Sequence, residues 1–136
     1  MESGVIFADS SFWIAATLRG DDRHALAAQL ADVFAGQLVA TSNLVVGETW
    51  SFLRRRDTHR TAMSWLQRLR SAAGVRIHRV EPDMEDEAWS WLGAHDERSY
   101  SFVDATSFAL MRRLQLREAL AFDGDFTAAG FLELRA

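Results

Sequence analysis

The fold is decided by the stretch VIFADSS at residues 5–11. After Gly4 comes a run of four apolar residues, and a short apolar run that stops at a polar residue is typical of a buried β-strand. Asp9 ends the run. Ser10 and Ser11 then begin a helix, so the stretch predicts a strand over residues 4–8 that leads through an acidic residue into a helix.

Outward from this stretch, short apolar runs alternate with apolar side chains at helical spacing. This alternation predicts a three-layer α/β/α sandwich with a mainly parallel central sheet. We expect residues 1–136 to form a single domain, because a chain of 136 residues can bury one core and not comfortably two. Further strands are predicted over residues 38–40, 75–80, 119–122 and 131–134, and further helices beginning near Asp22, Ser42, Asp57, Pro82 and Asp104. Three tryptophans fall on the apolar sides of these helices and are expected in the core: Trp13, Trp65 and Trp89.

Acidic residues recur where the predicted strands end. Asp9 follows the first strand, and Asp123 and Asp125 follow the strand over residues 119–122. Asp104 begins the helix that leads into that strand, and Glu48 lies about one turn into the helix after the strand over residues 38–40. Parallel strands joined by right-handed crossovers end at the same edge of a sheet, where ligands bind. We therefore expect these carboxylates to gather at one edge.

Gathered carboxylates need a counter-charge, because two of them about 5 Å apart repel by roughly 3 kcal/mol at an effective dielectric of about 20. Arginine, shared protons or a divalent cation can supply it. Oxygen ligands without His or Cys suit Mg²⁺ or Mn²⁺ best. Each acid also has a purely structural interpretation: Asp9 or Asp104 as a helix N-cap, Glu48 as a solvated helix residue, and residues 123–125 as a tight turn.

Composition narrows the chemistry further. The sequence has no cysteine, which excludes disulfides, thiol nucleophiles and cysteine-based zinc sites. All fifteen basic residues are arginine, and the absence of lysine excludes P-loop NTPases and Schiff-base chemistry. The formal net charge of −4 argues against a strongly cationic nucleic-acid binder, although local arginine clusters can still bind a polyanion.

The sequence shows no sign of export or of membrane insertion. Its first ten residues carry no positive charge, which a secretory signal requires. The longest uncharged run, between Asp32 and Glu48, is shorter than the ~20 residues of a membrane-spanning helix. We expect a cytoplasmic protein that does not contact a membrane.

Taken together, the acidic segments resemble the PIN-domain family, and more narrowly the VapC-type ribonuclease toxins of bacterial toxin–antitoxin modules. The resemblance covers essentially the whole chain and rests on residues 5–11, 45–49, 101–105 and 119–126. It implies that a catalytic metal is held by an acidic quartet, Asp9, Glu48, Asp104 and Asp123, with Asp125 as an auxiliary metal ligand.

The resemblance also implies an activity and partners. The activity would be that of a Mg²⁺-dependent endoribonuclease, with Mn²⁺ as a substitute, that hydrolyses phosphodiester bonds in single-stranded or loop RNA. The partners would be a second copy of the chain, in a homodimer, and a small cognate antitoxin protein. Ser11 would lie beside the site and bind phosphate or a metal-bound water. Guanidinium groups pair with phosphate, so four arginines are candidates for RNA binding unless they simply form solvated helix faces: Arg54, Arg55, Arg112 and Arg113.

Two alternatives belong to other classes. Residues 122–127 contain the Asp-x-Asp-x-Thr pattern of haloacid-dehalogenase-like phosphatases, in which the first Asp is the nucleophile. Only eleven residues follow Asp125, whereas that fold needs most of its sheet after this motif and typically a lysine. The second alternative is a catalytically inactive PIN-like module that binds RNA or a protein.

Overall fold

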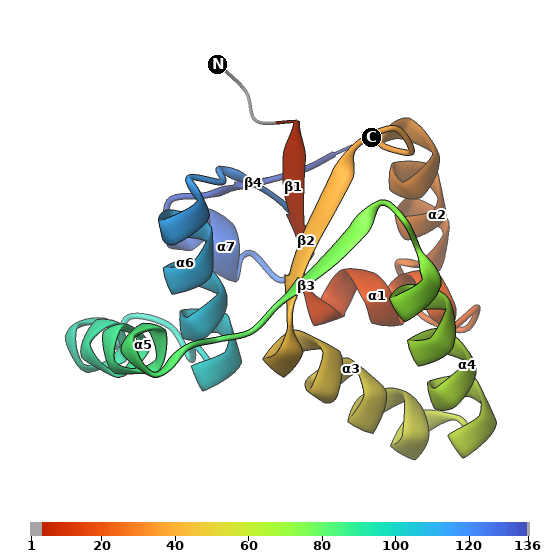
Figure 1. Ribbon diagram of the computed structural model, residues 1–136, viewed down its shortest axis with the longest axis horizontal. Helices are drawn as coiled ribbons and strands as arrows, with labels where there is room; N and C mark the ends of the chain where they lie inside the picture. Colours follow the sequence, from red (N-terminus) through yellow and green to blue (C-terminus); the bar gives the residue numbers. More distant parts are fainter. Residues whose placement is uncertain (1–3, 136) are drawn as a thin grey trace.

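A five-stranded parallel β-sheet forms the centre of the protein in a computed structural model, which describes residues 4–135 (Figure 1). The strands lie in the order β3-β2-β1-β4-β5, so the first strand of the chain is in the middle. The predicted domain limits, residues 1 and 136, lie outside the described residues. The strand bounds are β1 Val5–Ala8, β2 Leu38–Ser42, β3 Val75–His78, β4 Glu118–Leu120 and β5 Leu132–Glu133.

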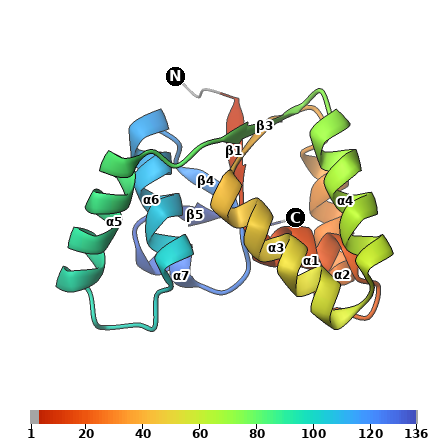
Figure 2. The same ribbon diagram turned by 60° about the horizontal axis from the view of Figure 1, so that its bottom comes forward.

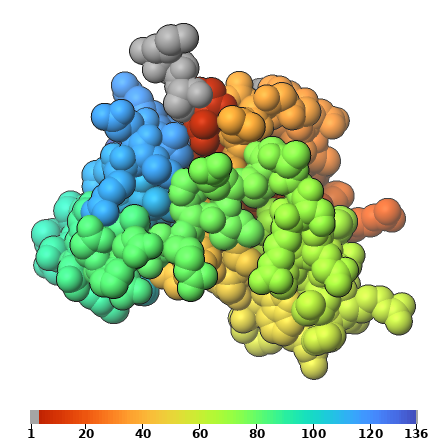
Figure 3. All heavy atoms as spheres, viewed as in Figure 1, coloured from red at the N-terminus to blue at the C-terminus, as the bar shows by residue number. Residues whose placement is uncertain are grey.

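Helices cover both faces of this sheet, which confirms the predicted three-layer sandwich. The views in Figures 1 and 2 place α5, α6 and α7 beside one face and α1, α2 and α4 beside the other, with α3 packed against α1 and α4. In the space-filling view, β3 and the connection to α5 lie at the surface between α4 and α5 (Figure 3). The helix bounds are α1 Ser10–Thr17, α2 His24–Val33, α3 Asn43–Arg56, α4 His59–Ser71, α5 Pro82–Ala94, α6 Phe102–Leu114 and α7 Asp125–Ala128.

The alternation of side chains along β1 explains why both faces are covered. Successive residues of a strand point to opposite faces. Phe7 packs in the core beneath α6 and α7 with Phe108 and Phe126, whereas Ile6 and Ala8 belong to the core beneath α1 and α2. All of these residues are almost completely buried. The strand predicted from the VIFA run is therefore buried on both sides, as its uninterrupted apolar sequence indicated.

The sheet topology determines where a ligand can bind. From β1 the chain adds β2 and β3 on one side, then crosses over to add β4 and β5 on the other side of β1. In open parallel sheets, ligands bind outside the carboxyl ends of the strands at such a switch point. Asp9 directly follows β1, and its backbone N–H donates to Leu120 O of β4 at 3.0 Å, so it stands at this point.

Three predicted strands end earlier than expected. The one predicted over residues 131–134 is observed as Leu132–Glu133, and beyond the other two, side chains accept the backbone hydrogen bonds. The strand predicted over residues 119–122 is observed as Glu118–Leu120, since the N–H of Phe122 donates to Ser11 Oγ at 3.2 Å. The strand predicted to reach residue 80 ends at His78, and the N–H of Val80 donates to Asn43 Oδ1 at 2.8 Å.

Two further expectations are wrong in detail. Asp104 does not begin its helix: α6 begins at Phe102, and Asp104 lies in the first turn, in a capping box with Ser101. Trp89 is not in the core, because 58% of it is exposed and its ring stacks on Phe102 with a centroid separation of 4.2 Å. The core positions expected for the other two tryptophans are confirmed, with Trp65 buried and Trp13 packed against all three core clusters.

Across residues 4–135, no helix is both long and apolar enough to span a lipid bilayer.

Candidate active site

Asp9 is the most deeply buried acid of the predicted quartet. It is the N-cap of α1, and its Oδ2 accepts hydrogen bonds from the backbone N–H of Ser11 at 3.2 Å and from Ser11 Oγ at 2.8 Å. Only 3% of the residue is exposed. Its other oxygen, Oδ1, is buried without a hydrogen-bond partner in the described part of the chain. A buried carboxylate oxygen in this position is unfavourable unless a proton or a cation meets it.

The surroundings of Asp9 raise its pKa to about 7 from the ordinary value of 3.8. Burial is the largest cause, and the carboxylates of Asp104 and Glu48 act in the same direction, against the hydrogen bonds from Ser11. The N-cap interpretation of Asp9 is therefore correct, and Asp9 also lies within the electrostatic influence of Asp104 and Glu48, as the site interpretation expects. The cap holds the carboxylate in place, and its burial and neighbours make its charge unfavourable without a counter-charge.

Glu48 reaches the same site from α3. This helix begins directly after β2, with Ser42 as its N-cap, and Ser42 Oγ accepts from the N–H of Val45 at 3.0 Å. Glu48 is exposed, and Ser10 Oγ donates a hydrogen bond to its Oε1. Ser10 is buried and directly follows Asp9, so this hydrogen bond holds the Glu48 side chain against the neighbour of Asp9 in the chain. This contact could not be predicted from the sequence, since nothing in the local pattern relates two residues 38 positions apart.

Asp104 is fixed by a capping box at the start of α6, and two other carboxylates act on it electrostatically. In the capping box, the N–H of Ser101 donates to Asp104 Oδ2 at 3.0 Å, and the N–H of Asp104 donates to Ser101 Oγ at 2.9 Å. Partial burial raises the pKa of Asp104, and the carboxylates of Asp125 and Glu48 raise it further, against the hydrogen bonds from Ser101. Asp104 therefore shares an electrostatic environment with Asp9, Glu48 and Asp125.

The last two acids lie on the loop after β4 and have different surroundings. Asp125 begins α7, and Arg98 Nε donates to its Oδ1 at 2.9 Å. Asp123 is exposed and pairs with Arg23 Nη1 at 3.5 Å. Partial burial and the Asp125 carboxylate raise the pKa of Asp123, while Arg23 lowers it. Asp125 thus interacts electrostatically with Asp104, whereas the ion pair of Asp123 is with Arg23.

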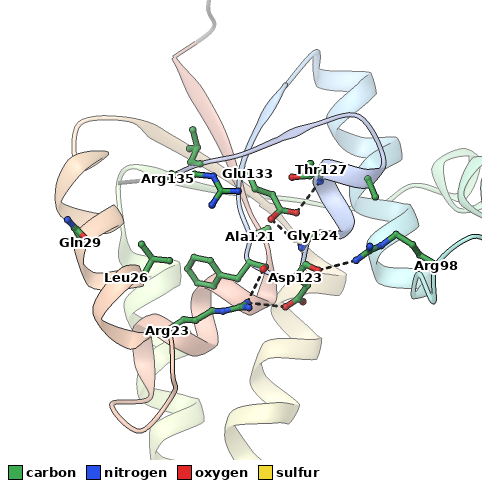
Figure 4. A pocket seen from close by; sticks show the side chains of 13 residues that line it. Arg23, Leu26, Gln29, Arg98, Ala121, Asp123, Gly124, Thr127, Glu133 and Arg135 are labelled. Atoms are coloured by element: carbon green, nitrogen blue, oxygen red, sulfur yellow. Dashed lines mark hydrogen bonds and ion pairs between the residues drawn. The ribbon is translucent and has the colours of Figure 1, made fainter.

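This loop, residues 122–125, is fastened from three directions (Figure 4). Arg98 Nη2 donates to Asp123 O at 3.1 Å, and Arg23 Nη1 donates to Phe122 O at 2.9 Å. The buried Glu133 accepts from the N–H of Gly124 at 3.3 Å and from the N–H of Thr127 at 3.1 Å. Gly124 permits the turn because its φ of 82° lies in the left-handed region. Arg23, Arg98 and Glu133 were not predicted as site residues, because nothing in their local sequence indicates these contacts.

The donor set fits a hard divalent cation. It consists of carboxylate oxygens without sulfur or imidazole, which Mg²⁺ and Mn²⁺ prefer, and the unpartnered Oδ1 of Asp9 is a ready ligand. Within residues 4–135, no three acidic or histidine side chains are already close enough to enclose an ion. The acids would therefore have to approach one another to enclose an ion, and Glu48 and Asp125 are not fully buried.

The predicted RNA-binding residues are distributed unevenly. Ser11 lies at the site, bonded to Asp9 and to the backbone of Phe122. Arg112 pairs with Glu87 at 3.0 Å and Arg113 pairs with Asp83 at 2.9 Å, and both acids belong to α5. The two arginines lie ~12 Å or more along α6 from Asp104. Arg54 and Arg55 are exposed in the last turn of α3, ~9 Å or more along the helix from Glu48. The structure does not bring these four arginines to the acidic site.

The chain belongs to the PIN domain family, whose model matches residues 6–132. The chain is 51% identical over 133 residues to the 23S rRNA-specific endonuclease VapC20 of Mycobacterium tuberculosis, in strains CDC 1551 / Oshkosh and ATCC 25618 / H37Rv alike. The match covers 96% of this chain and 98% of the relative.

A solved structure agrees with this assignment. The crystal structure of the VapC20 toxin of the same organism, which cleaves the sarcin–ricin loop, has a TM-score of 0.89 at 50% identity, over 96% of this chain and 99% of the other. The predictions of a PIN-like fold and of an endoribonuclease toxin are confirmed. The phosphatase alternative is wrong, because only α7 and β5 follow β4 in the described chain and the family is that of PIN domains.

Proposed function

We propose that the protein cleaves the sarcin–ricin loop of 23S ribosomal RNA, using Mg²⁺, or Mn²⁺ in its place, held by acids around the carboxyl-terminal edge of the sheet. The ligands are the predicted quartet together with Asp125. The main support for a bound metal ion is the buried, unpartnered Oδ1 of Asp9, together with the nearby carboxylates of Asp104 and Glu48. Support for the substrate comes from the similarity to VapC20, which extends over almost the whole of both chains.

In this proposal the acids hold the cation, and Ser11 orients one of them. When bound, a divalent cation supplies an activated water and offsets negative charge on the leaving oxygen. Asp9 and Asp104 have the most restricted carboxylates, because each is part of a helix cap. Ser11 Oγ donates to Asp9 and accepts from the N–H of Phe122. Because its proton is used on Asp9, the role of Ser11 in this proposal is to orient Asp9.

The proposal also includes partners and a compartment. Similarity to a toxin supports a small cognate antitoxin protein and a homodimer, which the resemblance to the VapC-type toxins implies. A ribosomal substrate supports action in the cytoplasm. For the whole of residues 1–136 we propose one nuclease domain, supported by a single sheet that joins β1 to β4 and β5.

The test of substrate and metal uses a synthetic hairpin with the sarcin–ricin loop sequence. We expect a single cleavage in the loop with Mg²⁺, none with EDTA, and recovery when Mn²⁺ is added in excess over EDTA, because metal-assisted hydrolysis needs no side-chain nucleophile. Gel electrophoresis of the end-labelled hairpin measures the products. A hairpin of the same stem with a scrambled loop is the control. Cleavage that persists in EDTA would contradict the metal, and equal cleavage of both hairpins would contradict the substrate.

The two acids of the loop after β4 are expected to differ in importance. Asp125→Asn should raise the Mg²⁺ concentration needed for half-maximal cleavage more than Asp123→Asn does. Each acid pairs with an arginine, but the Asp125 carboxylate acts on Asp104 and its side chain is 20% exposed, against 59% for Asp123. Initial rates across a Mg²⁺ titration of both variants measure this. The opposite order would make Asp123 the more important ligand of the two and Asp125 only auxiliary.

A further inference from the structure

A second site candidate lies on the far side of the acidic loop from Asp104. A cavity of about 800 Å³, hereafter the arginine cavity, opens between α2, the loop after β4, α7 and the end of β5. Figure 4 shows three arginines around it, from three separate segments of the chain: Arg23 before α2, Arg98 before α6 and Arg135 after β5. None of the three was a predicted RNA-binding residue.

Arg98 is paired with Asp125 at 2.9 Å, so Arg23 and Arg135 supply the accessible positive charge of the arginine cavity. Glu133 is buried, and its oxygens accept from backbone N–H groups. Asp123 pairs with Arg23 alone, at 3.5 Å, and the Arg23 side chain is still 49% exposed. Arg135 is exposed and makes no hydrogen bond or ion pair with any residue of the described chain. The cavity thus presents guanidinium N–H groups that an anion can reach, directly beside a site rich in negative charge.

Apolar side chains complete the arginine cavity. Leu26, which is 37% exposed, and the partly exposed Phe122 both line it, and the guanidinium of Arg23 lies 5.6 Å from the centre of the Phe122 ring. An apolar surface next to guanidinium groups matches the two halves of a nucleotide, since unstacked bases pack on aromatic and apolar side chains while phosphates pair with arginine.

The geometry connects this cavity to the acidic site. The loop of residues 122–125 places Phe122 and Asp123 in the cavity, and its last residue, Asp125, interacts electrostatically with Asp104. Arg98 donates hydrogen bonds to two residues of this loop, at Asp125 Oδ1 and at Asp123 O. One strand of RNA that crosses the loop would therefore meet the acids on one side and the arginines on the other.

We propose that the arginine cavity binds a nucleotide of the RNA strand that flanks the cleaved bond, with Arg23 and Arg135 on its phosphate and Phe122 and Leu26 against its base. This inference rests on the proposed function, because it assigns a subsite to the same RNA. Continuity with the acidic site and the apolar lining favour RNA over an acidic segment of a protein partner, which would need only the positive charges.

The test removes Arg135, because it has no partner in the fold to disturb. In an Asp104→Asn background that prevents cleavage, we expect Arg135→Gln to weaken binding of a fluorescent sarcin–ricin hairpin roughly fivefold to tenfold. The slope of log K against log salt concentration should fall by about 0.7 for one lost phosphate contact. In the otherwise intact enzyme, Arg135→Gln should raise KM and leave kcat unchanged, because Arg135 contacts no acid of the catalytic site.

The matched control is Arg117→Gln. Arg117 is equally exposed and precedes β4, so it lies at the opposite edge of the sheet from the arginine cavity. It removes the same charge, and we expect little change in RNA affinity. Equal affinities and salt slopes for the two variants would overturn the inference, as would an Arg135→Gln variant that loses only antitoxin binding. Either result is compatible with Mg²⁺-dependent cleavage by the unaltered protein, so the proposed function is tested separately.

Discussion

Asp9→Asn and Asp104→Asn are each expected to slow RNA cleavage about a thousandfold. An amide has no negative charge, so each substitution removes a ligand charge from the cation, and a loss of about 4 kcal/mol of transition-state stabilisation corresponds to three powers of ten in rate. Both variants should keep the fold, because Asn caps helices about as well as Asp does. Asn also has an oxygen that accepts the hydrogen bond from the N–H of Ser11 or of Ser101.

Initial rates on the hairpin at saturating Mg²⁺, with thermal unfolding to confirm the fold, measure this effect. Asp86→Asn, an exposed acid on α5, is the control and should cleave at the rate of the unaltered protein. The same variants can be examined in cells: expression without an antitoxin should slow growth, and Asp104→Asn should relieve it. If Asp104→Asn were as toxic as the unaltered protein, the harm would not come from cleavage by this site.

The second large effect concerns the stability of the metal-free protein, which is expected to fall as the pH rises from about 4 to about 7. The pKa of Asp9 is about 7 in the folded protein and 3.8 as the ordinary value, so between these values the folded state binds one more proton than the unfolded state. The free energy of unfolding then falls by ~1.4 kcal/mol per pH unit, or roughly 4 kcal/mol in all. Below pH 3.8 and above about pH 7, Asp9 adds no further slope.

Comparison with Asp9→Asn isolates this contribution from other titrating groups. The raised pKa of Asp104 acts in the same direction, while the pKa of His78, lowered by burial and by Arg76, acts in the opposite one. In EDTA, the Tm of the unaltered protein should fall by several degrees relative to that of Asp9→Asn between pH 5 and pH 8. Mg²⁺ at pH 8 should raise the Tm of the unaltered protein and not that of the variant. Parallel Tm curves would show that Asp9 is not a buried, titrating ligand.

The positions of the acids along the fold could be predicted because they depend on local sequence. The apolar run before Asp9 indicates a buried strand, and the serines after it indicate a helix start, so the acid had to lie at a strand end. The parallel sheet then brings distant strand ends together by topology alone. The same reasoning placed Glu48 near Asp9, although the hydrogen bond from Ser10 that joins them was not predicted.

Contacts between residues far apart in the sequence could not be predicted. Arg23 bonds to Phe122 O across 99 residues, and Arg98 to Asp125 across 27, while Arg112 and Arg113 were candidates for RNA and instead pair with acids of α5. An arginine on a helix has the same local sequence whether it faces solvent or a carboxylate on another element. Trp89 shows the same limit for an apolar residue, since helical spacing predicted it on the core side of α5, whereas the buried residues of that helix are Met84 and Ala88.

The central place of β1, with β4 beside it and Glu133 holding the acidic loop, has a consequence for the order of synthesis. Ribosomes make Asp9 first, but its neighbour strand and Asp125 come more than a hundred residues later, and Glu133 later still. A nascent chain that has just passed β3 therefore still lacks Asp104 and Asp123, half of the proposed quartet. In the proposed function, the acidic site is complete only once Glu133 has been added, because Glu133 accepts a hydrogen bond from the N–H of Gly124 in the acidic loop.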